Sequence, residues 1–322
     1  MILYAPAKVN LYLRILGKRS DGYHDIETIF ERIALFDKIV LSSLKGSGPG
    51  ERGIKIFSDH PDVPVDKDGL VYKTVDMLKR RFNISKGIEV RIFKRIPVAS
   101  GLGGGSSDAA AILTGLNKLW KLSLSSAELI EFGKTLGADI PFFLSGSSFA
   151  LAEGRGDKIV PLDWKMRWWH LLVYVPIRLF SKDIYEMYSK NVASDLTREP
   201  QITKILPLDA AAKSDRDKGS LARPGKAERL FPNPAKVTFG NVTNFIKNDL
   251  EEVVLKKEPI VAKLKKTLEK IGLAHSLVSG SGPSIFILFE KRKEAMAGKE
   301  LLIRRFPVVK REGWEIFMVP TA

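Results

Sequence analysis

The sequence predicts a protein of two domains that combine α-helices with β-strands. The chain has 322 residues, of which 44% are hydrophobic, which allows a substantial core and is more typical of two domains than of one. Alternation of apolar and polar residues over 7–16 and 88–92 indicates half-buried strands. Apolar residues at helical spacing over 70–82 indicate an amphipathic helix. A glycine-rich stretch at 101–107 joins one of these strands to a second helix.

The glycine-rich stretch has the composition of a phosphate-binding loop. The strand over 88–92 precedes it, and an Ala- and Leu-rich helix over 109–120 follows it. The first N–H groups of a helix lack partners within the helix, and the helix dipole places partial positive charge there. Glycines let a backbone approach a ligand closely, and Ser106 and Ser107 are able to cap the helix or to donate hydroxyls to an oxyanion. We therefore expect a phosphate cradle.

Two common phosphate loops do not match this stretch. A Walker A loop ends in a lysine followed by Ser or Thr, and no lysine lies between Gly101 and Asp108. In a dinucleotide fingerprint counted from Gly101 and Gly103, the third glycine position is occupied by Ser106. A flexible Gly/Ser connection without a ligand is the alternative, but the glycine density favours close approach to a ligand.

Composition excludes several classes of protein. No apolar run approaches the roughly 20 residues that a membrane-spanning helix needs. The segment from Met1 to Pro6 lacks the basic and apolar regions of a signal peptide. The chain has no cysteine, so it forms no disulfide and has no thiolate metal ligand. We expect a cytoplasmic protein that does not interact with membranes.

The net charge of +15 allows three interpretations. A basic protein binds nucleic acid, attracts anionic substrates such as ATP, or simply carries a dispersed basic surface that keeps it soluble. The basic residues are scattered along the chain and do not gather in one arm. This distribution favours the last two interpretations over nucleic-acid binding.

The glycine-rich stretch carries a resemblance to a known family. It reads Pro-x-x-x-Gly-Leu-Gly-Gly-Gly-Ser-Ser and resembles the ATP loop of the GHMP kinases, which include galactokinase, homoserine kinase and mevalonate kinase. Continued through Asp-Ala-Ala, it is similar to the branch that phosphorylates 4-diphosphocytidyl-2-C-methyl-D-erythritol in non-mevalonate isoprenoid synthesis. The resemblance implies ATP as cosubstrate with Mg²⁺. The implied ATP-binding residues are Lys94, Pro97, Gly101, Leu102, Gly103, Gly104, Gly105, Ser106 and Ser107.

The first strand carries two polar residues that point the same way. Over Ala7 to Leu16 the alternation predicts one buried face, and Lys8 and Asn10 lie together on the other. A solvated strand-edge lysine is the alternative to a functional one. The run Ala-Pro-Ala-Lys-Val-Asn-Leu is similar to the first motif of the same kinase branch, which implies that Lys8 is catalytic and that Asn10 contacts the substrate.

A Tyr-His pair follows the turn at Asp21-Gly22. Such a pair is commonly structural. The resemblance implies instead that Tyr23 stacks on a cytosine ring and that His24 hydrogen-bonds it, with Tyr185 as the second aromatic and Phe180 as its rival. Homoserine and mevalonate carry no nucleobase, so this pair distinguishes the cytidyl branch from the other GHMP kinases.

An aspartate follows a well-marked helix end. Ser125 and Glu128 form a capping box, and Gly137 suits the C′ position at which the helix ends. Asp139 comes next and is followed by the apolar run Ile-Pro-Phe-Phe. It either caps a short further helix or acts chemically. The resemblance implies that Asp139 is the catalytic base and that Lys8 orients it.

The adenine and metal contacts are less well marked. Lys94 is either a plain lysine at a strand end or, as the resemblance implies, a neighbour of adenine. The family usually has an asparagine where this chain has Gly69, which puts an adenine contact there in doubt. We expect Mg²⁺ to accompany ATP near Ser107, although no cluster of carboxylates in the sequence resembles a dedicated metal cage.

The rest of the chain sets the expected domain organisation. A hairpin over 147–162 ends the first domain, 1–162, and the second, 163–322, includes an inserted segment of loop character at 197–240. The Gly/Ser loop at 279–284 resembles the third GHMP motif, which closes on the phosphate loop. The resemblance implies an α+β fold with a ribosomal-S5-like N-terminal half, a ferredoxin-like C-terminal half and an active site in the cleft between them.

The expected partners are small molecules. They are ATP and a cytidine diphosphate derivative, bound by a monomer or a homodimer. Two alternatives are a different small-molecule GHMP kinase, such as one similar to homoserine kinase, and a non-enzymatic basic RNA-binding protein with this fold. The joint presence of Lys8, Asp139 and both glycine loops argues against the second alternative.

Overall fold

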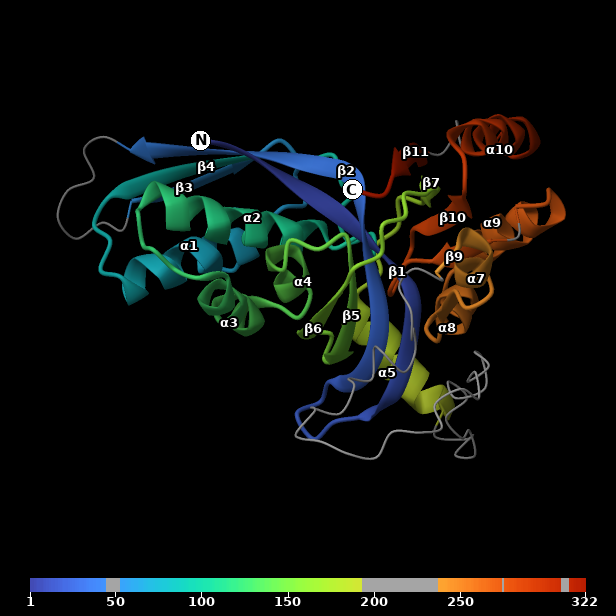
Figure 1. The fold of residues 1–322 in the computed structure, drawn as a ribbon, viewed down its shortest axis with the longest axis horizontal. Helices are drawn as coiled ribbons and strands as arrows, with labels where there is room; N and C mark the ends of the chain where they lie inside the picture. The colour runs from blue at the N-terminus through green and yellow to red at the C-terminus, as the bar shows by residue number, and fades with distance from the viewer. Residues whose placement is uncertain (45–52, 193–236, 274, 308–312) are drawn as a thin grey trace, which may run out of the picture.

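The computed structural model describes residues 1–44, 53–192, 237–273, 275–307 and 313–322. Two β-sheets form the frame of these residues (Figure 1). The strands of the first sheet are, in spatial order, β3 (Ile54–Ser58), β4 (Gly87–Phe93), β2 (His24–Leu44), β1 (Ile2–Lys18) and β8 (Lys247–Asn248), with the hairpin of β5 (Phe149–Gly154) and β6 (Lys158–Leu162) paired to β2. The second sheet has the order β11 (Glu315–Pro320), β7 (Trp169–Tyr174), β10 (Ile285–Phe289) and β9 (Ser276–Val278).

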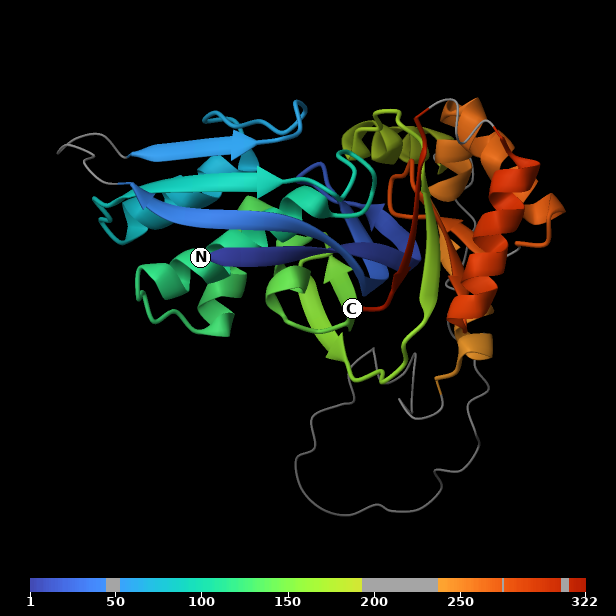
Figure 2. The ribbon, with the colours of Figure 1, turned by 90° about the horizontal axis from the view of Figure 1, so that it is seen from above.

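Helices cover each sheet from outside. One group packs beneath the first sheet and lies behind its strands in the view from above (Figure 2). This group consists of α1 (Leu70–Arg81), α2 (Gly104–Leu119), α3 (Ser126–Leu136) and α4 (Ile140–Leu144). The elements near the second sheet are α5 (Ser181–Val192), α7 (Phe239–Thr243), α8 (Glu251–Lys257), α9 (Pro259–Lys270) and α10 (Arg292–Arg305). Every described helix falls short of the length and apolarity that a membrane crossing requires.

The antiparallel pair of β1 and β2 runs through the whole molecule. The two strands have 17 and 21 residues and pair along their length with three register shifts. We predicted one buried face for β1, and this was wrong, because Lys8 and Asn10 on its polar face are also buried, at 5% and 2% exposure. The phosphate loop and the β9–β10 loop lie against these polar side chains and exclude water from them.

A shared apolar cluster joins the two sheets. Val9 and Leu11 of β1 pack in one core with Leu172 of β7 and with Phe286 and Leu288 of β10. Burial of this apolar surface is the main source of stability between the halves. Because residues of both halves make up the site, this cluster also fixes their relative position.

The segment that connects the two sheets contains the proposed domain boundary. β6 ends at Leu162 and the second sheet begins with β7. We propose a boundary after Leu162, although the short strand β8 of the second half returns to pair with β1. Most of the predicted insertion 197–240 lies outside the described residues, and α7 begins at Phe239, inside its predicted end.

Local sequence signals were partly right around α3. The capping box of Ser125 and Glu128 is present, with both reciprocal hydrogen bonds. Gly137 is the C-cap, but its φ of −180° is extended backbone and not the left-handed conformation of a C′ glycine. The chain leaves α3 in this extended conformation and enters α4 directly at Asp139 and Ile140.

Candidate active site

The phosphate loop ends in the first turn of α2. The helix begins at Gly104 and not at the predicted 109, with Gly103 as N-cap at a φ of 72°, which favours glycine. Neither Ser106 nor Ser107 caps the helix, because both lie inside its first turn and the N-cap residue has no side chain. The N–H groups without intrahelical partners at this end belong to Gly103, Gly104, Gly105 and Ser106.

The remaining residues of the motif shape the loop. Ser100 donates a hydrogen bond to the carbonyl of Pro97 at 2.7 Å and closes the turn that starts the loop. Leu102 is buried in the core that joins the two sheets. A Cβ added at Gly105 would meet no atom within 4 Å, so the start of α2 is open at this point. The loop is anchored at Pro97 and Leu102 and accessible at Gly105.

The two glycine loops are in direct contact, as the third motif predicted. A Cβ at Gly101 would lie 2.1 Å from the carbonyl oxygen of Ser279, and the φ of Gly101 is +79°. The Ser279 hydroxyl donates to the Gly101 carbonyl at 3.1 Å. Only glycine allows this approach of two backbones at position 101.

Lys8 lies where these loops meet β1. Its backbone N–H donates to the Leu102 carbonyl at 2.9 Å, and its Nζ donates to Asn10 Oδ1 at 2.7 Å. The Nζ also lies 3.7 Å from Asp139 Oδ2. A Cβ at Gly280 would lie 3.5 Å from this Nζ. Lys8 is therefore not a solvated strand-edge lysine but a buried ammonium between both loops and a carboxylate.

The surroundings of Lys8 control its charge. Burial lowers the pKa of the Lys8 ammonium, and the nearby Asp139 carboxylate partly offsets that effect. Asn10 completes the support, because its Nδ2 donates to Thr28 Oγ1 at 2.8 Å and Thr28 donates to the Tyr12 carbonyl at 2.6 Å. The Oδ1 of Asn10 is thus held in place to accept the hydrogen bond from Lys8.

Asp139 does not cap the helix that follows it. It occupies the N-cap position of α4, but its side chain makes no capping hydrogen bond. Its carboxylate is 31% exposed and points towards Lys8. The geometry thus leaves this carboxylate accessible beside a cation, at the edge of the phosphate loop.

Two of the predicted base-binding residues, His24 and Tyr185, are in contact, and Tyr185 lies within the electrostatic influence of Asp139. The His24 ring lies 5.2 Å from the Tyr185 ring, and its Nε2 is 2.6 Å from Ser189 Oγ. Burial, followed by the negative charge of Asp139, raises the pKa of the Tyr185 phenol. Tyr23 is 55% exposed, and the Arg155 guanidinium lies 5.1 Å from its ring centroid.

The two aromatic candidates for the second stacking residue differ in position. Tyr185 contacts the His24 ring and lies within the electrostatic reach of Asp139. Phe180 is 60% exposed, and it precedes the first residue of α5. The geometry favours Tyr185.

Lys94 lies in a buried ionic cluster below α2. Its Nζ is hydrogen-bonded to Asp37 Oδ2 and lies 2.9 Å from Asp108 Oδ2. The lysine side chain is only 5% exposed. Asp37 Oδ1 also accepts hydrogen bonds from the backbone N–H groups of Arg95 and Ile96. The ammonium therefore connects β2, the start of the phosphate loop and α2, and the predicted position of Lys94 near adenine stays a prediction.

The cluster holds one cation and two carboxylates. Burial raises the pKa of Asp108 to about 7, against the attraction of Lys94, and the Asp37 carboxylate adds to the rise. Burial also acts against the charge of Lys94, but Asp108 and Asp37 outweigh it and raise the pKa of this ammonium. The cluster is closest to neutral when Asp108 is protonated.

A steric constraint explains why glycine occupies position 69. It is the N-cap of α1 and has no capping side chain. A Cβ at this position would lie 2.3 Å from the Pro64 carbonyl oxygen, so an asparagine does not fit this backbone. A side-chain contact from position 69 to adenine is therefore absent in this chain.

The Ser107 hydroxyl is suited to bind a metal ion that accompanies a nucleotide. Ser107 Oγ is buried at the start of α2 and has no hydrogen-bond partner. Among the described residues, no group of three or more His, Asp or Glu side chains could hold a metal ion. A single protein oxygen next to a phosphate site suits Mg²⁺, which takes most of its ligands from phosphates and water.

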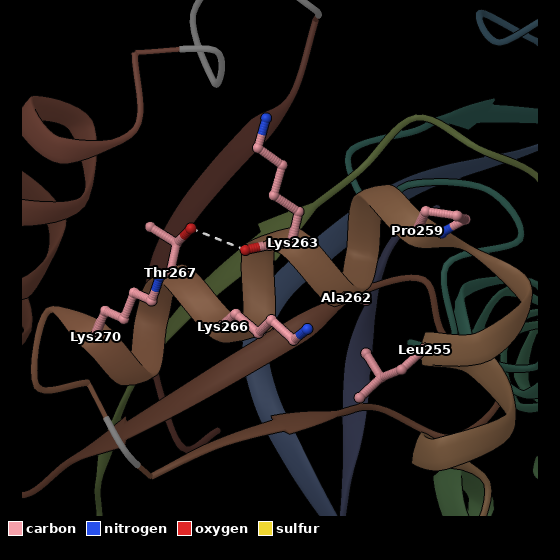
Figure 3. Close-up of a pocket in the computed structure, with 7 residues that line it drawn as sticks. All are labelled: Leu255, Pro259, Ala262, Lys263, Lys266, Thr267 and Lys270. Carbon is pink, nitrogen blue, oxygen red and sulfur yellow. Dashed lines mark hydrogen bonds between the residues drawn. The ribbon is translucent and has the colours of Figure 1, made fainter.

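A surface hollow between α8 and α9 lies outside this site (Figure 3). It contains none of the predicted site residues. Its lining residues are Leu255, Pro259, Ala262, Lys263, Lys266, Thr267 and Lys270.

Comparisons with known proteins agree with this geometry. The model of the GHMP kinases N terminal domain matches residues 69–147, and that of the GHMP kinases C terminal matches residues 235–305. A protein of Enterococcus faecalis named 4-diphosphocytidyl-2-C-methyl-D-erythritol kinase is 39% identical over 90% of this chain and 90% of its own length. A protein of the same name from Synechococcus sp. is 37% identical over 99% of this chain and 94% of its own.

Solved structures show the same fold. The crystal structure of a 4-(cytidine 5'-diphospho)-2C-methyl-D-erythritol kinase has a TM-score of 0.67 at 24% identity, with all of both chains covered. A homoserine kinase from Cytophaga hutchinsonii has a TM-score of 0.63 at 17% identity, covering 100% of this chain and 94% of its own. The predicted two-domain GHMP kinase fold, with mixed α and β structure, is confirmed.

The chain belongs to the GHMP kinase family. The relatives that place it there, from Enterococcus faecalis to Synechococcus sp., carry the name of the cytidyl-methylerythritol branch.

Sequence reasoning did not find several residues of the site. Thr28 and Ser189 act through contacts between segments far apart in the chain, which no local pattern reveals. Asp37 did leave a signal, since a carboxylate within the apolar strand Leu35 to Leu41 needs a buried partner. Arg155 lies in the predicted hairpin turn, where a solvated role is the usual expectation.

We expect Asp108→Asn to reduce the pH dependence of the free energy of unfolding. The folded state raises the pKa of Asp108 from 3.8 to about 7, so it binds this proton more tightly than the unfolded chain does. Asp108 makes its full contribution to the free energy of unfolding below pH 3.8, and this contribution is lost as the pH rises through about 7. Asparagine is neutral throughout, so the variant should lose less stability than the unmodified chain between pH 5 and pH 8 in urea titrations.

The exposed Asp68 supplies the control, since Asp68→Asn should leave the pH dependence unchanged. Equal pH dependence of Asp108→Asn and the unmodified chain would contradict the assignment of the raised pKa to Asp108.

Proposed function

We propose that the chain transfers the γ-phosphoryl group of ATP to the 2-hydroxyl of 4-diphosphocytidyl-2-C-methyl-D-erythritol, a step of non-mevalonate isoprenoid synthesis. The observation that carries the proposal is the convergence of both glycine loops on Lys8, beside the accessible carboxylate of Asp139. The relatives named for this substrate support its identity.

The phosphate loop binds the nucleotide. The N–H groups at the start of α2 and the partial positive charge of the helix dipole face the phosphates at Gly105, where the backbone is open. When bound with ATP, Mg²⁺ neutralises phosphate charge, and Ser107 Oγ is the protein group that would hold it. The Asp37–Lys94–Asp108 cluster fixes the position of the loop relative to the helix α2.

Asp139 and Lys8 carry the chemistry. Asp139 takes the proton of the 2-hydroxyl as that oxygen forms its bond to the γ-phosphorus. The bond from this phosphorus to the bridging oxygen breaks, and ADP leaves. Lys8, at 3.7 Å, orients the carboxylate and offsets the negative charge that develops on the transferred group. The protein's contribution is mostly position and electrostatics.

The cytidine end of the substrate is the part that Tyr23, His24 and Tyr185 receive. Tyr23 and Tyr185 supply rings for stacking, and His24, which follows Tyr23 and contacts the Tyr185 ring, is the hydrogen-bonding group. Arg155 covers one side of the Tyr23 ring and leaves the other for the base. Asn10 supports Lys8 through its Oδ1, and the second N–H of its amide is the group that would contact the substrate.

The site lies between the two halves of the chain. Lys8, Asp139 and the phosphate loop come from the first half, whereas Tyr185 and Gly280 come from the second. All of these groups belong to one chain, so a monomer suffices and a homodimer is compatible. We place the enzyme in the cytoplasm, where ATP and nucleotide-linked intermediates occur.

Asp139→Asn should abolish most turnover while ATP still binds. The amide keeps the shape of the carboxylate but does not accept the hydroxyl proton, so kcat should fall by about 10²- to 10⁴-fold. ADP release and ATP titration calorimetry measure the two properties separately. The exposed Asp163→Asn is the matched control. Full turnover by Asp139→Asn would show that another group is the base.

Tyr23→Ala should raise the KM for the cytidyl substrate and leave the KM for ATP unchanged. Stacking of a base on an aromatic ring is worth about 1–3 kcal/mol, which corresponds to a roughly 5- to 150-fold increase. The control is Tyr4→Ala, because Tyr4 is similarly exposed at the opposite end of β1. An unchanged KM for the cytidyl substrate would favour a substrate without a base.

A further inference from the structure

We propose that Asn248 is a positioning residue for the ATP site and that it acts through the β9–β10 loop, residues 279–284. The inference rests on the proposed function, because it concerns the way in which that site holds its nucleotide. Asn248 is buried, at 6% exposure, and its part in the reaction is to fix the backbone that lies on the phosphate loop.

The side-chain amide of Asn248 donates to two backbone carbonyls of this loop region. Its Nδ2 lies 2.9 Å from the Val278 carbonyl oxygen and 2.7 Å from the Gly280 carbonyl oxygen, one on each side of Ser279. The Leu250 N–H donates to Asn248 Oδ1 at 2.9 Å, which fixes the orientation of the amide. An amide nitrogen has two N–H groups, so one donates to each carbonyl and both are used.

The backbone of Asn248 is attached to the strand that carries Lys8. The strand β8 pairs in parallel with β1, and Asn248 lies opposite Leu13. The backbone N–H of Asp249 donates to the Leu13 carbonyl at 3.0 Å, and Asp249 Oδ2 accepts from the Ile15 N–H at 3.0 Å. Asn248 therefore connects the strand β1 with a loop of the second half of the chain.

The loop held in this way lies directly on the ATP site. A Cβ added at Gly280 would lie 3.2 Å from Asn10 Oδ1 and 3.5 Å from Lys8 Nζ. The neighbouring Ser279 contacts Gly101 of the phosphate loop through its carbonyl oxygen and through its hydroxyl. A shift of this backbone segment would therefore move the support of the phosphate loop.

A carboxylate holds the start of the same segment. Glu251 Oε1 accepts from the Val278 N–H at 2.9 Å and from Lys265 Nζ at 3.1 Å. Asn248 and Glu251 thus bind the C=O and the N–H of Val278. Asn248 also makes the contact that continues into the loop, at Gly280.

Loss of the amide would leave two buried carbonyls without this donor. Both Val278 and Gly280 are buried, and a buried polar group that loses its partner is costly, so the backbone is expected to shift towards another partner or towards water. Because the loop meets the phosphate loop at Gly101, this shift should weaken the binding of ATP. The residues proposed for the cytidine end lie elsewhere, so the KM for the cytidyl substrate should not change.

The test measures the Kd for Mg-ATP by calorimetry and the KM values of both substrates in the full chain. Asn248→Asp keeps the size of the side chain and the oxygen that accepts from Leu250, but it replaces the donating NH₂ group with an oxygen. Its Kd and KM for ATP should rise by about tenfold, the value of one hydrogen bond. Asn248→Ala, which adds no negative charge, should show the same selective increase.

Asn117 supplies a matched control. It lies at the opposite end of α2 from the phosphate loop, and its amide also holds a loop, with Nδ2 donating to the Leu124 carbonyl at 2.9 Å and Oδ1 accepting from the Leu124 N–H at 3.0 Å. Asn117→Asp should lower the free energy of unfolding and leave the Kd for ATP unchanged. Selective loss of ATP binding therefore separates positioning from a general loss of stability.

A double-mutant cycle tests whether the effect passes through the loop. Ser279→Ala removes the hydroxyl that donates to the Gly101 carbonyl and should itself weaken ATP binding. When Ser279→Ala is already present, Asn248→Ala should raise the Kd for ATP less than it does alone, because residues that act through a shared contact are not additive.

Two results would overturn the proposal. One is an unchanged Kd for ATP in the two Asn248 variants, with folding confirmed by urea titration. The other is full additivity of Asn248→Ala and Ser279→Ala in the Kd for ATP. Absence of turnover with the cytidyl compound in the unmodified chain would instead refute the proposed function, and calorimetry with Mg-ATP would still decide the role of Asn248.

Discussion

The site depends on one buried ammonium. Lys8 loses most of its hydration because it is only 5% exposed, and a buried charge is costly unless other groups replace the water. Asn10 and Asp139 supply that replacement at 2.7 and 3.7 Å. In the proposed reaction, the same contacts place the ammonium where phosphoryl transfer needs positive charge. Removing either partner would leave the charge of Lys8 less compensated, so stability and chemistry are coupled at this position.

Close contact between two backbones is the second constraint. Gly101 and Ser279 come from different halves of the chain, and a side chain at position 101 would separate them. The apolar cluster around Phe286 holds the two sheets at the distance that this contact requires. The phosphate loop is thus held from three sides: by the β9–β10 loop, by Lys8 through the Leu102 carbonyl and by the ionic cluster around Lys94.

The parts of the site within continuous motifs could be predicted from the sequence. The glycine loop, Lys8 and Asp139 each sit in a run whose composition limits what the backbone does. The start of α2 at Gly104 was mispredicted because glycine has low helix propensity, which contacts with the rest of the fold override here. The partners of Lys94 and His24 could not be predicted, because Asp37, Asp108 and Ser189 reach them only after distant strands and helices have packed.

The central claim is that this site phosphorylates an alcohol that carries a cytidine group. Its most direct test is ADP release from Mg-ATP with 4-diphosphocytidyl-2-C-methyl-D-erythritol, homoserine and mevalonate measured side by side. The account predicts turnover with the cytidyl compound alone, because only this compound carries a base for the proposed contacts of Tyr23, His24 and Tyr185. Turnover with homoserine or mevalonate, and none with the cytidyl compound, would contradict it.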